Sequence, residues 1–108
     1  MLVEHQKLVD AYFNALNAND ANAALVCFSD NAIVLDEGET LTGKKSIREW
    51  MEKTKKKYNP QFKLLGIKEN KDETIASTEV FGTFDGSPIV LDYHLKIKKN
   101  LIEKLRIS

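Results

Sequence analysis

The stretch SPIVLDYHLKIK, Ser87 to Lys98, alternates apolar and polar residues over most of its length. Successive side chains of a strand point to opposite faces, so this pattern predicts a β-strand with one buried face and one wet face. The apolar set is Ile89, Leu91, Tyr93, Leu95 and Ile97, and the other set is Val90, Asp92, His94, Lys96 and Lys98. A sheet with such an apolar face needs another layer packed against it.

The segments on both sides of this strand predict further antiparallel strands. Asp85-Gly86 is a strong hairpin signal, and it follows the long strand-like stretch 73–84. Residues 61–68 predict a strand before that one, with a turn at 69–72 between them. Residues 101–107 predict the last strand. The second half of the chain therefore predicts four strands joined as hairpins.

The first part of the chain predicts two helices. Apolar residues recur at helical spacing and indicate an amphipathic helix over about residues 2–18; they are Val9, Tyr12, Phe13 and Leu16. Asn17–Asp20 interrupts this helix. Asp20 is a good N-cap for a second, shorter helix that carries Ala24, Leu25 and Phe28.

A strand comes next, after a predicted turn at Ser29–Asn31. Its sequence begins AIVLD, and alternation places Ile33 and Leu35 on one face and Ala32, Val34 and Asp36 on the other. The acidic, glycine-containing stretch after Asp36 predicts a turn.

A third helix is predicted over residues 44–58, between Gly43 and Asn59-Pro60. Ser46 and Glu49 have capping-box spacing, and Thr42 is an alternative cap. Helices early and strands late indicate an α+β fold in one domain, residues 1–108. We expect a mixed, mostly antiparallel sheet that curves around the three helices.

Composition excludes several classes of function. Apolar residues make up 43% and charged residues 30% of the 108 residues, and sixteen basic residues balance sixteen acidic ones. A net charge of zero gives no reason to expect a nucleic-acid or membrane partner. No apolar run approaches the ~18 residues of a membrane span, and MLVEHQK lacks a signal-peptide pattern. We expect a cytoplasmic protein.

The sequence also lacks the patterns of metal and cofactor sites. Cys27 is the only cysteine, so a disulfide within the chain and a cysteine-cluster zinc site are excluded. His5 is expected to face solvent, and His94 belongs to the polar strand face, where a surface or dimer-interface role is expected. These two histidines form no metal-binding pattern, and phosphate-binding loops and nucleophile motifs are missing. We therefore expect no metal and no cofactor.

The region from Val9 to Trp50 resembles the SnoaL-like and ketosteroid isomerase branch of the nuclear transport factor 2-like superfamily. The matching features are a helix with Tyr before ALNAND, a phenylalanine before an acidic turn, a strand ending in Asp, and Gly followed by the IREW helix. The resemblance implies a cone-shaped curved sheet, an apolar pocket closed by the helices, and commonly a homodimer through the outer sheet face. The family includes isomerases, cyclases, dehydratases, hydrolases and non-catalytic binders, so the fold alone does not assign a reaction.

The resemblance also suggests roles for three residues. Asp36 falls where ketosteroid isomerases have their general base, and Tyr12 falls where they have an oxyanion-binding tyrosine. Tyr93 falls where they have a protonated aspartic acid, and Glu37 replaces the proline after the base. A base beside an acidic C–H and donors to the enolate oxygen are what proton transfer between carbons requires.

Each of these residues also has a structural alternative. Asp36 leads into an acidic turn and could be a solvated strand end, while Tyr12 and Tyr93 could be core tyrosines with satisfied hydroxyls. The predicted ligand pocket is lined by Phe28, Trp50, Met51, Phe62 and Phe81. Three hypotheses follow: a cofactor-free isomerase or cyclase acting on a small hydrophobic carbonyl compound, a non-catalytic binder of a small hydrophobic molecule, and a homodimeric interaction module.

Overall fold

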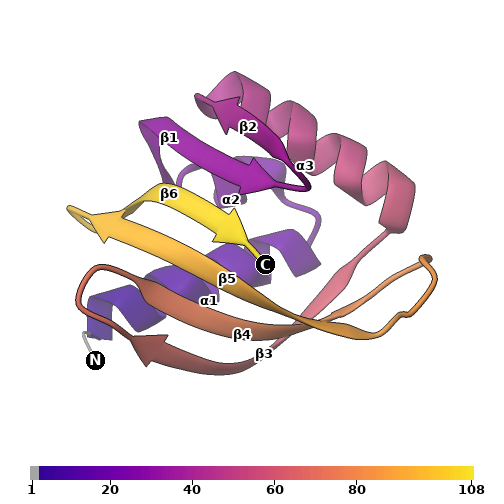
Figure 1. Cartoon of the computed structure of the whole chain (residues 1–108). Coiled ribbons are helices and arrows are strands. Elements are labelled where there is room, and N and C mark those ends of the chain that lie inside the picture. Colours follow the sequence, from indigo (N-terminus) through magenta and orange to yellow (C-terminus); the bar gives the residue numbers. More distant parts are fainter. Residues whose placement is uncertain (1–2) are drawn as a thin grey trace.

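In the computed structural model, which describes residues 3–108, three helices pack against one curved sheet (Figure 1). The helices are α1 (Val3–Asn17), α2 (Ala21–Leu25) and α3 (Lys44–Tyr58). The strands are β1 (Phe28–Asp36), β2 (Glu39–Thr42), β3 (Gln61–Glu69), β4 (Thr74–Phe81), β5 (Ile89–Lys98) and β6 (Leu101–Ile107). The predicted α+β fold is confirmed.

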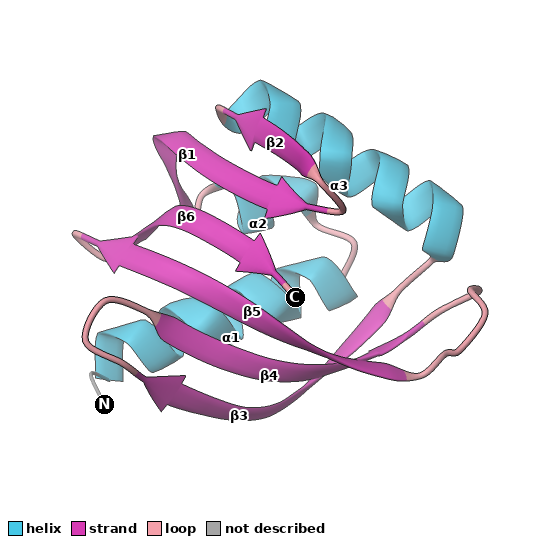
Figure 2. Ribbon diagram, in the orientation of Figure 1, coloured by secondary structure: helices cyan, strands magenta, loops and turns pink. Residues whose placement is uncertain are grey.

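The six strands follow the order β2-β1-β6-β5-β4-β3. The β1–β6 pair is parallel, and the other neighbouring pairs are antiparallel. The sheet is thus mixed and mostly antiparallel, as the hairpin signals and the resemblance indicated. Figure 2 shows the helices gathered on one side of the curved sheet, which leaves its other face open.

The alternation predicted for Ser87–Lys98 builds the middle of the core. Leu95 on β5 lies opposite Leu105 on β6, and Leu105 lies opposite Val34 on β1. All three side chains are fully buried. Burying a side chain of this size contributes about 1.5–3 kcal/mol, so this row across three strands is a substantial part of the stability.

Helix α1 is held against the sheet by apolar packing and by two hydrogen bonds of one side chain. Val9, Tyr12 and Phe13 are buried on its inner face, as their spacing predicted. At its end, the Asn17 side-chain amide donates to the Phe62 carbonyl at 2.8 Å, and its oxygen accepts from the Phe62 amide at 2.8 Å. The Asn17 side chain thus forms the two hydrogen bonds that a neighbouring strand would form with Phe62. These bonds hold the end of α1 next to the start of β3.

Three expectations about the β1–α3 region are wrong. Ser29–Asn31 is part of β1 and not a turn, and the pairing register shifts between Phe28 and Ile33. The stretch after Asp36 turns only at 37–38, because 39–42 forms β2 and pairs with β1. Helix α3 starts after Gly43, which has a positive φ of 86° and no side-chain cap, so neither the capping box nor Thr42 is used.

The predicted strand 73–84 is also too long, since β4 stops at Phe81. The next residues turn toward the end of α3, where the Thr83 amide donates to the Tyr58 carbonyl at 2.8 Å. A Cβ on Gly82 would lie 2.7 Å from that carbonyl oxygen, so this close approach requires glycine. The loop 82–88 is thereby attached to the C-terminus of α3.

His5 is not solvent-facing. Its Nδ1 lies 2.9 Å from a carboxylate oxygen of Glu69 and 3.3 Å from the Thr74 hydroxyl. The ends of β3 and β4 place Glu69 and Thr74 on the inner face, where α1 brings the histidine. His94 lies on the outer sheet face as expected, where its Nε2 contacts the Ser108 hydroxyl at 3.0 Å.

Between residues 3 and 108, no helix is both long enough and apolar enough to cross a membrane. The two longest, α1 and α3, have 15 residues each and carry charged side chains on their outer faces.

Candidate functional site

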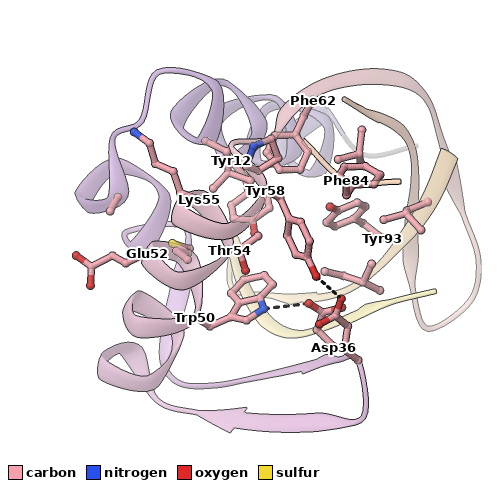
Figure 3. Close-up of a pocket in the computed structure, with 18 of the residues that line it drawn as sticks. Tyr12, Asp36, Trp50, Glu52, Thr54, Lys55, Tyr58, Phe62, Phe84 and Tyr93 are labelled. Atoms are coloured by element: carbon pink, nitrogen blue, oxygen red, sulfur yellow. Dashed lines mark hydrogen bonds between the residues drawn. The ribbon is translucent and has the colours of Figure 1, made fainter. Parts of the chain in front are cut away.

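A cavity of about 780 Å³ lies between the concave sheet face and the helices α1 and α3 (Figure 3). Its walls come from the end of α1, the start of α2, one side of α3, the ends of β1, β4 and β6, and the starts of β3 and β5. The curvature of the sheet produces this space, because the helices cannot reach the whole concave face. A cavity of this size accommodates a small organic molecule.

Asp36 contributes a carboxylate to the cavity at the point where β1 ends. The Trp50 indole N–H, from α3, donates to its Oδ2 at 3.0 Å (Figure 3). Burial raises the pKa of the Asp36 carboxyl above its ordinary value, and the charges of Glu37 and Glu39 raise it further, while the Trp50 hydrogen bond opposes the shift. A half-buried carboxylate with a raised pKa is a stronger base than an exposed one.

Replacing the indole donor is expected to raise the pKa of Asp36 further. Trp50→Phe keeps an aromatic ring at the wall but removes the hydrogen bond that stabilises the charged carboxylate. A ¹³C-carboxyl NMR titration of both proteins measures this shift directly. An Asp36 pKa that stays the same, or falls, would contradict the assigned role of Trp50.

Tyr12 lines the same cavity from α1 and is fully buried. Its hydroxyl has no hydrogen-bond partner among residues 3–108. Burial, followed by the charges around it, raises the pKa of this phenol well above its ordinary value, so it is a neutral donor. Buried tyrosine hydroxyls usually have a partner, so a hydroxyl without one, on a residue that lines a cavity, is a candidate donor to a ligand.

Tyr93 lines the cavity from β5 and is 4% exposed. Its ring packs edge-on against Phe13, with centroids 5.0 Å apart. Burial, and secondarily the Asp36 charge, raises the pKa of this phenol too. The three residues named by the resemblance therefore line one cavity. They contribute a carboxyl group with a raised pKa and two neutral phenols.

The five aromatic and methionine residues expected to line a pocket divide into two groups. Trp50, Met51 and Phe62 line the cavity. Phe28 and Phe81 are not among its lining residues. Phe28 begins β1 and does not belong to the second helix as predicted; it is 1% exposed and packs edge-on against Tyr12. Phe81 is 39% exposed on the outer face.

Sequence reasoning did not bring together four residues at the solvent side of the cavity, which we call the mouth cluster: Glu37, Tyr58, Phe84 and Asp85. The Tyr58 hydroxyl donates to a carboxylate oxygen of Glu37 at a long 3.5 Å, and its ring meets Phe84 edge-on with centroids 5.6 Å apart. These residues come from three separate segments. The available signals were the aromatic character of Phe84 and the helical spacing that puts Tyr58 on the same side of α3 as Trp50 and Met51.

Five carboxylates and one lysine line the cavity: Asp20, Asp36, Glu37, Glu52, Asp85 and Lys55. Among residues 3–108, none of these carboxylates forms an ion pair. Within the same part of the chain, no group of three or more His, Cys, Asp or Glu side chains is placed to hold a metal ion. The cavity is thus acidic.

Comparison with known protein families identifies the family to which this chain belongs. The family model of the SnoaL-like domain matches residues 9–98. The chain is a SnoaL-like domain. The match includes Tyr12, Asp36 and Tyr93, and it confirms the resemblance found in the region from Val9 to Trp50. A comparison with curated proteins finds no match.

Solved structures give the SnoaL-like domain the same fold. A candidate polyketide cyclase from Sinorhizobium meliloti is 32% identical, with 94% of each chain covered and a TM-score of 0.91. A candidate polyketide cyclase from Xanthomonas campestris is 20% identical over 96% of this chain and 88% of its own, with a TM-score of 0.81. A ketosteroid isomerase-like protein from Catenulispora acidiphila, solved with trimethylamine, is 19% identical over 94% and 83%, with a TM-score of 0.81.

Proposed function

We propose that this SnoaL-like domain is a cofactor-free catalyst of proton transfer on a small hydrophobic carbonyl compound, as an isomerase or a cyclase. The observation that supports this most is that Asp36, Tyr12 and Tyr93 all line one cavity. A base and two phenols are the groups that enolate chemistry requires. The names of the structural neighbours, candidate polyketide cyclases among them, agree with this reaction class.

In the proposed reaction, Asp36 is the base. Trp50 holds Oδ2, so Oδ1 takes a proton from the carbon next to the substrate carbonyl. The C–H electron pair moves into the new C=C bond of the enolate, and negative charge develops on the carbonyl oxygen. An isomerase returns the proton from Asp36 to a different carbon. In a cyclase, the enolate carbon forms a C–C bond to a second carbonyl of the same molecule, the π pair of that carbonyl moves onto its oxygen, and this oxygen takes the proton from Asp36.

The phenols of Tyr12 and Tyr93 stabilise the enolate in this scheme. Burial keeps both phenols neutral, so each can donate a hydrogen bond to the oxygen as it becomes negative. Such bonds are stronger to an anion than to a neutral carbonyl. They therefore stabilise the transition state more than the ground state, and this difference is what lowers the barrier.

Tyr12→Phe tests the proposal on a panel of β,γ-unsaturated ketones, followed by the absorbance of the conjugated product. The rate is expected to fall by about 10²-fold or more, the usual effect of removing one oxyanion donor. The melting temperature is expected to stay the same or rise, because the hydroxyl has no partner to lose.

Ser77→Ala serves as the matched control, since it removes a hydroxyl on the outer sheet face, where Ser77 donates to Asp92. Its rate is expected to stay within a few-fold of the wild-type value. An unchanged rate in Tyr12→Phe together with a lower melting temperature would make Tyr12 a core residue and reject its catalytic role.

Non-catalytic binding of a small hydrophobic molecule is the second candidate. It is favoured by the apolar part of the wall, which includes Leu16, Val80 and Leu91. Saturable binding of the ketones without turnover, proton exchange or cyclisation would support this function in place of catalysis.

A further inference from the structure

We propose that the substrate carries a positive charge, an ammonium group, in addition to its carbonyl, and that the mouth cluster binds this group. The inference rests on the proposed function, because it names the substrate class of the same cavity. The carbonyl end would lie by Asp36, Tyr12 and Tyr93, and the cationic end by Glu37 and Tyr58.

The charge of the cavity supports a cation. The residues that line the cavity include five carboxylates and one lysine, and these carboxylates lack ion-pair partners among the described residues. Figure 3 shows Glu52 and Lys55 projecting outward from α3, away from Asp36. With these two side chains set aside, the remaining lining charges are the carboxylates of Asp20, Asp36, Glu37 and Asp85, and Glu37 is next to the base in the chain. A concave surface lined by one sign of charge concentrates ligands of the opposite sign.

The aromatic rings provide the second argument. Tyr58 and Phe84 meet at an interplanar angle of 83° and form a corner at the mouth, and Trp50 lies beside Asp36. Rings attract cations over their faces, and perpendicular rings beside carboxylates form the walls of sites for alkylated ammonium ions.

The protein's own Lys57 already behaves as such a cation. Its ammonium nitrogen lies 5.0 Å from the centroid of the Tyr58 ring. The pKa of Lys57 is raised, chiefly by Tyr58 and also by the charge of Glu37. Lys57 is exposed and is not one of the lining residues. In the proposed complex, the ammonium group of the ligand takes its place at the Tyr58 ring.

An independent observation shows that the cavity is built to hold a polar molecule. The Tyr12 hydroxyl is fully buried, lines the cavity and lacks a partner among residues 3–108. A purely hydrocarbon ligand would leave this hydroxyl unsatisfied, which is unfavourable. A molecule with a carbonyl at one end and an ammonium at the other satisfies both ends of the cavity.

The test uses two probes of the same shape, acetylcholine and its neutral carbon analogue 3,3-dimethylbutyl acetate. Trp50 is the only tryptophan, so its indole N–H signal in NMR reports binding beside Asp36. We expect acetylcholine to bind about 10-fold more tightly at low salt, the effect of one cation–π contact together with nearby carboxylates. This preference is expected to decrease in 0.3 M salt, because exposed charges are screened.

Glu37→Gln, which removes the charge at nearly constant shape, is expected to reduce the preference several-fold. Glu79→Gln is the matched control, since Glu79 is on the outer face, opposite Val90 of β5. Equal or tighter binding of the neutral probe to the wild type would overturn the inference while leaving the proposed function intact. Binding of neither probe would also overturn it, and the ketone assay with Tyr12→Phe then decides the proposed function separately.

Discussion

Asp36→Asn is expected to lower the rate of proton transfer by about 10²–10⁴-fold, the usual contribution of a general base. The amide has the same shape and can still accept the Trp50 hydrogen bond through its oxygen, so the cavity should keep its geometry. The measurement is the initial rate of ketone isomerisation, or of exchange of the ketone's α-hydrogens with deuterated water. A rate equal to that of the wild type would remove Asp36 from the role of base.

The same substitution is expected to stabilise the folded protein at neutral pH. The folded state raises the pKa of Asp36 above its ordinary value of 3.8, so it binds a proton more tightly than the unfolded chain does. The resulting stabilisation is fully present below the unfolded pKa and is lost as the pH rises through the folded pKa. In denaturant unfolding, the free energy of unfolding of Asp36→Asn should therefore increase relative to that of the wild type as the pH increases. If the wild type were the more stable protein at pH 7, the burial argument would be wrong.

Phe28→Ala is expected to have the largest effect on stability, about 3–5 kcal/mol for the loss of a buried phenylalanine. Phe28 is 1% exposed, and its ring packs against Tyr12 with centroids 5.5 Å apart. The deletion would leave a void beside Tyr12. Unfolding in urea, read by far-UV circular dichroism, measures the loss.

Phe81→Ala is the matched control for this prediction. Phe81 is 39% exposed on the outer face of β4, so the same change should cost about 1 kcal/mol or less. Similar losses for the two variants would mean that Phe28 is not part of the core.

The sequence predicted the fold well wherever one regular pattern decided the structure. Alternation in β5 and helical spacing in α1 depend on the chain itself. The spacing in α1 is confirmed, and the alternation in β5 is confirmed from Leu91 onward, whereas Ile89 is 43% exposed. The errors occur where tertiary contacts decide. Strand β2 is short, polar and acidic, and it exists because β1 offers it an edge to pair with. Helix α3 begins after Gly43 without a capping side chain, because the β1–β2 hairpin positions the chain at that point.

The candidate site was predictable in part. The predicted face of each residue on its strand or helix, together with the family resemblance, indicated Asp36, Tyr12 and Tyr93. The structure places all three around the cavity. The mouth cluster was not predictable, since its members lie far apart in the chain and meet only through the attachment of loop 82–88 to α3. Phe28 was predicted on the second helix, whereas it begins β1. Its apolar character alone could not say whether it faces packed core or open cavity.

The parallel pairing of β1 with β6 has a consequence for how the molecule is made. Strand β6 comes last along the chain yet lies inside the sheet, between β1 and β5. During synthesis, the edge of β1 that pairs with β6 therefore stays unpaired until β6 has left the ribosome. Contacts between such distant segments slow folding, into the range of about milliseconds to seconds. Folding intermediates with that edge exposed are the species most prone to aggregate.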